Sequence, residues 1–356
     1  MRDLIIDHQR ISDTDPAYVI AEIGHNHGGD TQRALDLVET AADVGCSAAK
    51  FQKRHNQTLY TRDMYLSPYD NENSFGPTYG LHRDALELSA DGCADLMALG
   101  RELTFTVFAT AFDERSADFL MRLRVPAFKV ASGDLKNTPL LKHIAGFGLP
   151  MIVSTGGGTY ADVDRAVNTI WPINKHLALL HCTAAYPVHV HADLNLRAIP
   201  TMRDRYPELV IGWSGHDTGI AMPLMAYVLG ARIIEKHFTL NRTWKGTDQA
   251  FSLEPNGMRR LVRDLGRARE AMGDGDKRRL ACEEKPLAKM EKCLVAARPL
   301  PAGHLLCPGD LKACSPCYVG GLPPYLLESL TGFPLSCDLL FEEPVTYQHL
   351  EGASIA

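Results

Sequence analysis

The sequence predicts a closed (β/α)8 barrel followed by a small, β-rich domain. Up to about residue 275, short apolar runs alternate with amphipathic helical patterns, and eight such runs can be counted. Each run is almost continuously apolar, which is typical of parallel strands covered on both faces. Eight β–α units in about this length indicate a TIM barrel. After Met272 the alternation stops and the composition changes.

The predicted strands are separated by helices with clear start and stop signals. Thr159 can cap a helix in which Val163 and Ile170 lie on one apolar face. Pro139 stands in the first turn of another helix, where its missing N–H costs no hydrogen bond. Gly45 can end a helix by taking a positive φ. The strands are expected at residues 18–24, 48–52, 104–110, 127–132, 150–155, 177–183, 210–216 and 232–239.

An open, doubly wound sheet is the alternative that the same alternation allows. That fold usually carries the phosphate-binding fingerprint GxGxxG directly after its first strand. The corresponding stretch here, residues 24–30, reads GHNHGGD and does not match the fingerprint. The closed barrel is therefore the preferred fold.

The sequence after Met272 predicts a linker and a second domain. The stretch GDGDKRRLACEEKP is charged and has no hydrophobic period. We therefore expect a barrel domain over residues 1–275, a linker over 276–291 and a β-rich domain over 292–356. The last segment has short strands broken by Pro and Gly, and its core would be small, so docking on another surface is expected.

Charge and composition exclude several classes of protein. The net charge is −6 and no long block of Lys or Arg occurs, so neither nucleic-acid binding nor a membrane-surface patch is indicated. The N-terminal sequence lacks a signal-peptide pattern, and no apolar run approaches membrane-spanning length. We therefore expect a cytoplasmic protein. The nine cysteines do not suggest a disulfide framework, and the pair Cys314 and Cys317 is interpreted as part of an ordinary loop.

Polar side chains at the ends of the predicted strands form a candidate site. In a barrel, the strand ends converge on one mouth, where the chemistry of such proteins is found. Buried lysines are costly unless an anion compensates their charge, so Lys50 and Lys129 predict an anion site. Ser132 and Ser154 would add neutral donors around the same anion.

Two histidines at neighbouring strand ends form a candidate metal site. His216 and His237 can approach one ion together, and Glu235 or Asp248 can add a carboxylate. That set of ligands suits a divalent transition metal with open positions. Two histidines that only hydrogen-bond to neighbouring loops are the alternative at this point.

The ordered motifs of this chain resemble those of the N-acetylneuraminate (sialic acid) synthase family. The segment VAARPLPAGHLLCPGDL is similar to the opening of the family's C-terminal SAF (antifreeze-like, β-clip) domain. The resemblance covers nearly the whole chain and is more specific for the family than for the sugar. The motifs that carry it are EIGHNHGG, AAKFQ, AFKVASGD, MIVSTGG, LLHCTAAYP, NLRAIP, GWSGHDTG, IIEKHFT and GTDQAFSLEP.

The resemblance implies a metal-dependent condensation of phosphoenolpyruvate with an open-chain aldose, N-acetylmannosamine or a modified sugar. The implied product is a 3-deoxy-2-keto sugar acid of the sialic (nonulosonic) acid type, and phosphate is released. The implied cofactor is a divalent metal, Mn2+ ahead of Mg2+ or Co2+. The family further implies a domain-swapped homodimer in which each SAF domain covers the barrel mouth of the other subunit.

Residue roles can be carried over from the resemblance. His216 and His237 match the metal ligands. Asn26 and His27 are expected to shape the sugar side, while Gln52, Thr183 and Ser214 are strand-end groups expected to contact substrate. The implied catalytic residues are Glu22, Tyr186, Glu235 and Asp248. The implied phosphoenolpyruvate contacts are Lys50, Lys129, Ser132 and Ser154.

Several departures from the family's motifs bear on the substrate. Family members commonly read GPDHKAS where this chain has GTDQAFS, residues 246–252, and the Asp that usually precedes the metal His is Gly215 here. The SAF domain has no Arg near Cys314 and Cys317, where the family places one on the sugar's N-acetyl group. We therefore expect N-acetylmannosamine to be a poor substrate.

Two other functions are consistent with these departures. The first is a synthase for a non-N-acetylated or phosphorylated aldose, in which Lys53, Arg54 and Arg83 serve a second phosphate. The second is a non-catalytic binding protein derived from a synthase.

The polar segment from Tyr60 to Arg83 is expected to be a loop-like lid over the mouth.

Overall fold

The computed structural model describes residues 2–352, and the chain divides into two compact units between Gly273 and Asp274. The first unit is a closed barrel of eight parallel strands, in which each strand pairs with its sequence neighbour and β10 pairs with β3. The predicted barrel is confirmed, and each strand end lies within two residues of its prediction. The strands are β3 (Tyr18–Gly24), β4 (Ala48–Lys53), β5 (Thr106–Ala111), β6 (Phe128–Val130), β7 (Met151–Ser154), β8 (Leu177–Cys182), β9 (Val210–Gly215) and β10 (Ile233–His237).

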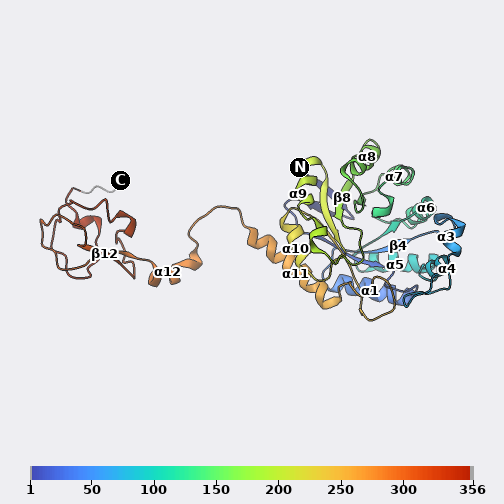
Figure 1. Ribbon diagram of the computed structural model, residues 1–356, viewed down its shortest axis with the longest axis horizontal. Coiled ribbons are helices and arrows are strands. Elements are labelled where there is room, and N and C mark those ends of the chain that lie inside the picture. Colours follow the sequence, from blue (N-terminus) through green and yellow to red (C-terminus); the bar gives the residue numbers. More distant parts are fainter. Residues whose placement is uncertain (1, 353–356) are drawn as a thin grey trace. The chain divides into compact units, whose positions relative to one another are not determined.

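Helices surround the barrel strands (Figure 1). The predicted caps are present: the Asp30 side chain accepts from the backbone N–H of Arg33, and Thr159 forms a capping box with Asp162. Val163 and Ile170 are buried, as their helical spacing requires. The surrounding helices are α1 (Thr31–Asp43), α5 (Ala90–Glu102), α6 (Glu114–Arg122), α7 (Thr138–Ala145), α8 (Tyr160–Ile170), α9 (Ala198–Arg205), α10 (Ala221–Val228) and α11 (Pro255–Met272).

An N-terminal hairpin closes the end of the barrel opposite the mouth. It consists of β1 (Asp3–Ile6) and β2 (Gln9–Ser12), which pair antiparallel. Its apolar side chains belong to the barrel core, where Leu4, Ile6 and Ile11 are buried. The Thr106 hydroxyl, at the first residue of β5, donates a 3.2 Å hydrogen bond to Asp7 in the hairpin turn. The sequence did not predict this hairpin.

The segment between β4 and β5 contains three short helices, and two of them, α3 and α4, fall in residues 60–83, where a loop was expected. These are α2 (Asn56–Leu59), α3 (Arg62–Leu66) and α4 (Tyr79–Ala85), and Figure 1 shows α3 and α4 beside one another. Thr61 and Thr78 cap α3 and α4. The predicted loop-like character is therefore wrong for residues 62–66 and 79–83.

The second unit has a small core of its own. Its only named strands within the described residues are β11 (Cys293–Ala296) and β12 (Leu311–Cys314), which pair antiparallel. The stretch predicted as a linker holds the 3-10 helix Ala281–Glu283 and α12 (Glu284–Met290). Eleven apolar side chains, among them Leu294 and Val345, pack together and share no member with the barrel core. Across residues 2–352, every helix is too short or too polar to cross a membrane.

Candidate active site

A cavity of about 450 Å3 lies at the C-terminal ends of the barrel strands, and all eight strands contribute to its wall. This is the end of the barrel where the strand-end argument predicts a site. The residues that line it are Glu22, His25, Lys50, Gln52, Arg54, Arg83, Thr110, Phe112, Lys129, Ala131, Ser132, Gly133, Ser154, Cys182, Ala184, Tyr186, Ser214, His216, Glu235, His237, Thr247 and Asp248.

The structure brings most of the predicted site residues together in this lining. The exceptions are Asn26, His27 and Thr183. Asn26 is 1 % exposed, and its side-chain amide donates to the carbonyl oxygen of Phe238 and to Ser252 Oγ, at 2.8 and 2.9 Å. It therefore ties two loops together instead of facing the cavity. His27 is equally buried, and its Nδ1 accepts the backbone N–H of Gly29 at 3.0 Å.

Two lysines and two carboxylates form the floor of the cavity. Lys50 and Glu22 are register partners on adjacent strands, and their side chains form an ion pair. Lys50 Nζ also donates to Thr110 Oγ1 at 2.9 Å and lies 3.7 Å from Glu235 Oε1. Lys129 Nζ lies 4.0 Å from the same Glu235 oxygen. The four charges sum to zero, so a bound anion would leave the floor with a net negative charge that further cations must balance.

Lys129 stands among the hydroxyl groups of the neighbouring strands. Its Nζ donates to Ser154 Oγ at 2.6 Å, and Ser132 Oγ accepts the backbone N–H of Gly156 at 3.1 Å. Burial lowers the pKa of Lys129, and the charge of Glu235 opposes that shift. A bound anion would reduce the cost of burying the ammonium group. One cation and two hydroxyls on the β6–β7 side thus form a suitable place for a phosphate or carboxylate group.

Glu235 is held as a carboxylate by its neighbours. Burial acts to raise its pKa, but the charges of Lys129 and Lys50 outweigh burial, so the pKa is lowered. Ser214 Oγ donates to its Oε1 at 3.0 Å. Glu235 therefore provides a fixed negative charge in the floor of the cavity at neutral pH.

The two histidines stand at the ends of neighbouring strands, with ring centroids 5.4 Å apart and ring planes at 58° to one another. His216 Nδ1 donates to the carbonyl oxygen of Thr183 at 2.9 Å, which leaves the lone pair of Nε2 free. Burial, together with the charge of His237, lowers the pKa of His216 to about 3, so this imidazole is neutral at pH 7. Thr183 thus orients His216 and does not line the cavity.

The donor atoms around the two imidazoles fit a divalent metal with open positions. His237 Nδ1 is buried without a hydrogen-bond partner, and it lies 3.6 Å from Asp248 Oδ2. The ring of Tyr186 lies 4.0 Å from that of His216. Within residues 2–352, no three His, Cys, Asp or Glu side chains form a complete metal-binding group. Water or substrate would therefore supply the remaining ligands.

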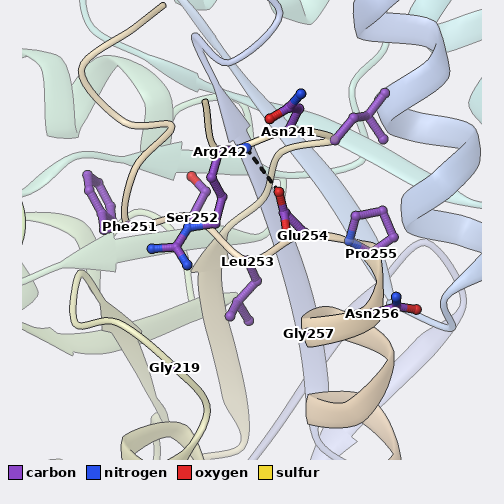
Figure 2. A pocket seen from close by; sticks show the side chains of 11 residues that line it. Gly219, Asn241, Arg242, Phe251, Ser252, Leu253, Glu254, Pro255, Asn256 and Gly257 are labelled. Carbon is purple, nitrogen blue, oxygen red and sulfur yellow. Dashed lines mark hydrogen bonds between the residues drawn. The ribbon is translucent and has the colours of Figure 1, made fainter. Parts of the chain in front are cut away.

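A second hollow of about 520 Å3 lies near the histidines, on the segments that follow β9 and β10. Figure 2 shows its lining, with the backbone N–H of Arg242 bonded to Glu254 at 3.1 Å. Phe251 lines the second hollow. Its ring centroid lies 5.0 Å from that of His237, which lines the candidate active site. None of the predicted site residues lines the second hollow, so it is not the candidate active site.

Comparisons with known proteins identify the family. A model of the NeuB family matches residues 37–277 of this chain. The chain belongs to the NeuB family. It is 39% identical over 291 residues to the N-acetylneuraminate-9-phosphate synthase of Mus musculus, a match that covers 82% of this chain and 81% of the mouse protein. The family inferred from the sequence motifs is thus confirmed.

Further relatives match more of the chain or have solved structures. The N,N'-diacetyllegionaminic acid synthase of Legionella pneumophila is 34% identical over 94% of both chains. The crystal structure of the N-acetylneuraminic acid synthetase from Leptospira borgpetersenii matches with a TM-score of 0.70 at 32% identity. That match covers 80% of this chain and 95% of that chain.

The departure from the NeuB motifs at Gly215 has a physical reason in the structure. Trp213 and Gly215 lie on the same face of β9, and a Cβ at Gly215 would stand 1.6 Å from the Trp213 ring. No side chain fits there while the ring keeps its place. The carboxylate next to His216 in the sequence comes instead from Asp217, which pairs with the fully buried Lys236 at 3.0 Å.

The altered GTDQAFS segment is held by hydrogen bonds of its own. Gln249 stands where the family's motif has a His, and its side-chain amide donates to the carbonyl oxygen of Asn26 at 2.9 Å. Its side-chain oxygen accepts from Thr239. Gln249 therefore connects the loop after β3 to the loop after β10 and keeps Asp248 at the cavity wall.

Proposed function

We propose that this protein condenses phosphoenolpyruvate with an open-chain aldose in a metal-dependent reaction that yields a 3-deoxy-2-keto sugar acid and phosphate. Membership of the NeuB family makes the chain a sugar-acid synthase. The relatives named above are synthases of N-acetylneuraminate 9-phosphate and of diacetyllegionaminic acid. The observation that carries the proposal is one cavity lined by two lysines, three carboxylates and three histidines.

Phosphoenolpyruvate is assigned to the Lys129 side of the cavity. Lys129 and the hydroxyls of Ser132 and Ser154 offer one charged and two neutral donors to an anionic group. Lys50 lies between this group and Glu22, where it can meet the second anionic group of the substrate. Because two carboxylates already balance the two lysines, a divalent metal at the histidines would supply the further positive charge that a substrate with several negative charges needs.

His216 and His237 are the proposed metal ligands. A divalent metal bound there, Mn2+ in our proposal, would supply Lewis-acid polarisation of the aldehyde carbonyl. The hydrogen bond from His216 to Thr183 fixes the ring and its tautomer, which is how proteins usually orient such ligands. Asp248 and Tyr186 border the same space and are proposed to position the aldose.

Glu22 is the proposed carboxylate at the reacting centre. In the reaction, C3 of phosphoenolpyruvate bonds to the aldehyde carbon, water adds at C2, and cleavage of the C2–O bond releases phosphate. Glu22 can stabilise the positive character at C2 and accept a proton from the attacking water. It is fixed by Lys50 and by Gln52, whose amide donates to Oε1 at 2.7 Å.

The test is release of phosphate by the purified protein from phosphoenolpyruvate, Mn2+ and a panel of aldoses. We expect release that depends on all three components, with the sugar acid detected by mass spectrometry. Glu22→Gln should lower kcat by about 100-fold while leaving the affinity for phosphoenolpyruvate nearly unchanged. The matched control, Glu39→Gln on the exposed face of α1, should behave as wild type. Binding of phosphoenolpyruvate without phosphate release from any aldose would contradict the proposed reaction.

A further inference from the structure

A large hollow lies at the end of the barrel opposite the candidate active site, and we call it the basal hollow. Its volume is about 1060 Å3, compared with about 450 Å3 for the cavity at the mouth. It is formed by the turn of the N-terminal hairpin and by the segments that lead into β4, β5 and β6. None of the candidate active-site residues lines it.

Three arginines line the basal hollow without a negative partner. Arg101 and Arg122 stand in the last turns of α5 and α6, and Arg124 lies in the turn that leads to β6. Among residues 2–352, no carboxylate oxygen lies within 4.0 Å of these guanidinium groups, and none of them donates a hydrogen bond. The carboxylate in the lining, Asp7, accepts a 3.2 Å hydrogen bond from Thr106. Positive charge is thus in excess here, in a chain whose net charge is −6.

The backbone of the basal hollow is left-handed at several residues that carry side chains. Across residues 2–352, six non-glycine residues have a positive φ, and four of them line this hollow. This conformation is unfavourable for any residue with a Cβ, and most of all for a β-branched one such as Thr. The four residues are Asp7, His8, Thr104 and Arg124, with φ of 47°, 71°, 51° and 60°.

Equivalent turns elsewhere in the barrel use glycine at this position. One residue beyond the C-caps of α1 and α10 stand Gly45 and Gly230, with φ of 86° and 106°. The same position after α5 and α6 is held by Thr104 and Arg124. His8 is the second residue of a two-residue hairpin turn, where glycine is also preferred. Backbone strain of this kind is found mainly where the side chains serve a ligand.

The remaining lining of the basal hollow is largely apolar. Phe105, Leu123 and Pro126 lie among the arginines in the same wall. A phosphate ion alone would leave most of the volume empty and the apolar wall uncovered. A ligand with an anionic group at one end and a flat apolar group at the other would match both parts of the lining.

We propose that the basal hollow binds a nucleotide, with its phosphate on Arg101, Arg122 and Arg124 and its base against the apolar wall. Guanidinium groups make forked contacts with phosphate oxygens, and the phosphate would supply the negative charge that the arginines lack. His8 and Thr104 would add neutral donors. This site goes beyond the proposed function and does not depend on it, because the two cavities lie at opposite ends of the barrel.

The experiment is calorimetric titration of the full-length protein with AMP, CMP, GMP and UMP, at about 0.15 M salt to screen weak surface attraction. Two further ligands each lack one half: ribose 5-phosphate has no base, and the free nucleoside has no phosphate. We expect one or more of the nucleotides to bind at least about 10-fold more tightly than both halves. Saturating phosphoenolpyruvate should leave this affinity unchanged.

Two variants test the arginines. Arg124→Gly should weaken nucleotide binding by about 10-fold without lowering the melting temperature, because glycine takes a φ of 60° without strain. Arg101→Gln should weaken binding by a similar factor. The matched controls are Glu342→Gly, at an exposed residue of the second unit with φ of 63°, and Arg260→Gln on the exposed side of α11. Both controls should bind the nucleotide like wild type.

Four results would each overturn the nucleotide site. These are no binding of any of the four nucleotides, equal affinity for ribose 5-phosphate, displacement by phosphoenolpyruvate, and wild-type affinity in both arginine variants. Release of phosphate from phosphoenolpyruvate and an aldose is measured separately, so the synthase reaction stands or fails independently of these results.

Discussion

His27 illustrates at the scale of one residue how burial couples protonation to folding. Burial lowers its pKa to about 4 from an ordinary value of 6.5. Between these two values the unfolded chain binds a proton at His27 and the folded chain does not. Stability therefore falls as the pH drops from 6.5 to 4, by roughly 1 kcal/mol per pH unit for this residue. The full contribution is present above pH 6.5.

The corresponding variant is His27→Asn, which keeps an acceptor for the backbone N–H of Gly29. We expect its free energy of unfolding to depend less steeply on pH than that of wild type, by roughly 1 kcal/mol per pH unit below pH 6. Urea unfolding at pH 7, 6 and 5 with a chelator present measures the two slopes. His8→Asn, an exposed histidine with φ of 71°, is the control. Equal slopes of unfolding free energy against pH for wild type and His27→Asn would show that burial does not lower the pKa of His27.

Single residues on the strands can be predicted from the sequence, whereas those in the loop after β3 cannot. Lys50 and Lys129 were placed correctly because the alternation of a strand fixes which side chains face the barrel interior. Beyond the strand end that rule stops. The chain turns at Gly24 and Gly28, with φ of 55° and 63°, and takes Asn26 and His27 out of the cavity lining. His25, which the sequence left without a role, stays in it.

At the scale of one element, the packing on β9 predicts a strong coupling between two positions. Gly215→Asp would restore the residue common in the family, but its Cβ would collide with the Trp213 ring. We expect a loss of about 3 kcal/mol in the free energy of unfolding, because the surroundings are closely packed. Trp213→Leu also destabilises, by leaving a cavity behind β9.

The double variant tests whether the ring causes the departure. When the ring is absent, the Asp side chain has room, so the double variant should lose at least about 1 kcal/mol less than the sum of the two single losses. Urea unfolding of the four proteins measures this coupling. Gly215→Asp combined with Trp171→Leu, at the distant end of α8, should be additive. Additive losses for Gly215 and Trp213 as well would contradict the steric explanation.

The elements that the sequence predicts differ from those it misses in length and burial. β3 is buried along all seven of its residues, and such a continuous apolar run is visible without a structure. β1 and β2 have four residues each, and exposed residues alternate with buried ones in β1. Four residues are too few to establish a period of two. The helices α3 and α4 are similarly short, and caps at Thr61 and Thr78 are their main local signal.

At the scale of the whole molecule, the two units have separate hydrophobic cores. A chain that ends after Leu280 should therefore fold with a melting temperature close to that of the barrel in the full chain. Its cavity would keep Lys50, Lys129 and the two histidines. If the second unit covers the mouth of another subunit, as the family resemblance implies, this truncated chain should bind phosphoenolpyruvate yet lose most of its activity with the aldose.

Mixing two inactive chains tests whether the second unit acts on the partner subunit. Full-length Lys129→Met has a defective cavity and an intact second unit. The truncated chain has an intact cavity and lacks the second unit. If the homodimer that the family resemblance implies forms, half of the dimers in an equal mixture would contain one of each chain, and each of these would have one competent, covered cavity. Phosphate release should then recover to roughly a quarter of the wild-type rate per chain. Two copies tagged differently allow the mixed dimers to be isolated and assayed directly. An inactive mixed dimer would show that no second unit serves its partner's cavity, and full activity of the truncated chain alone would remove the covering role altogether.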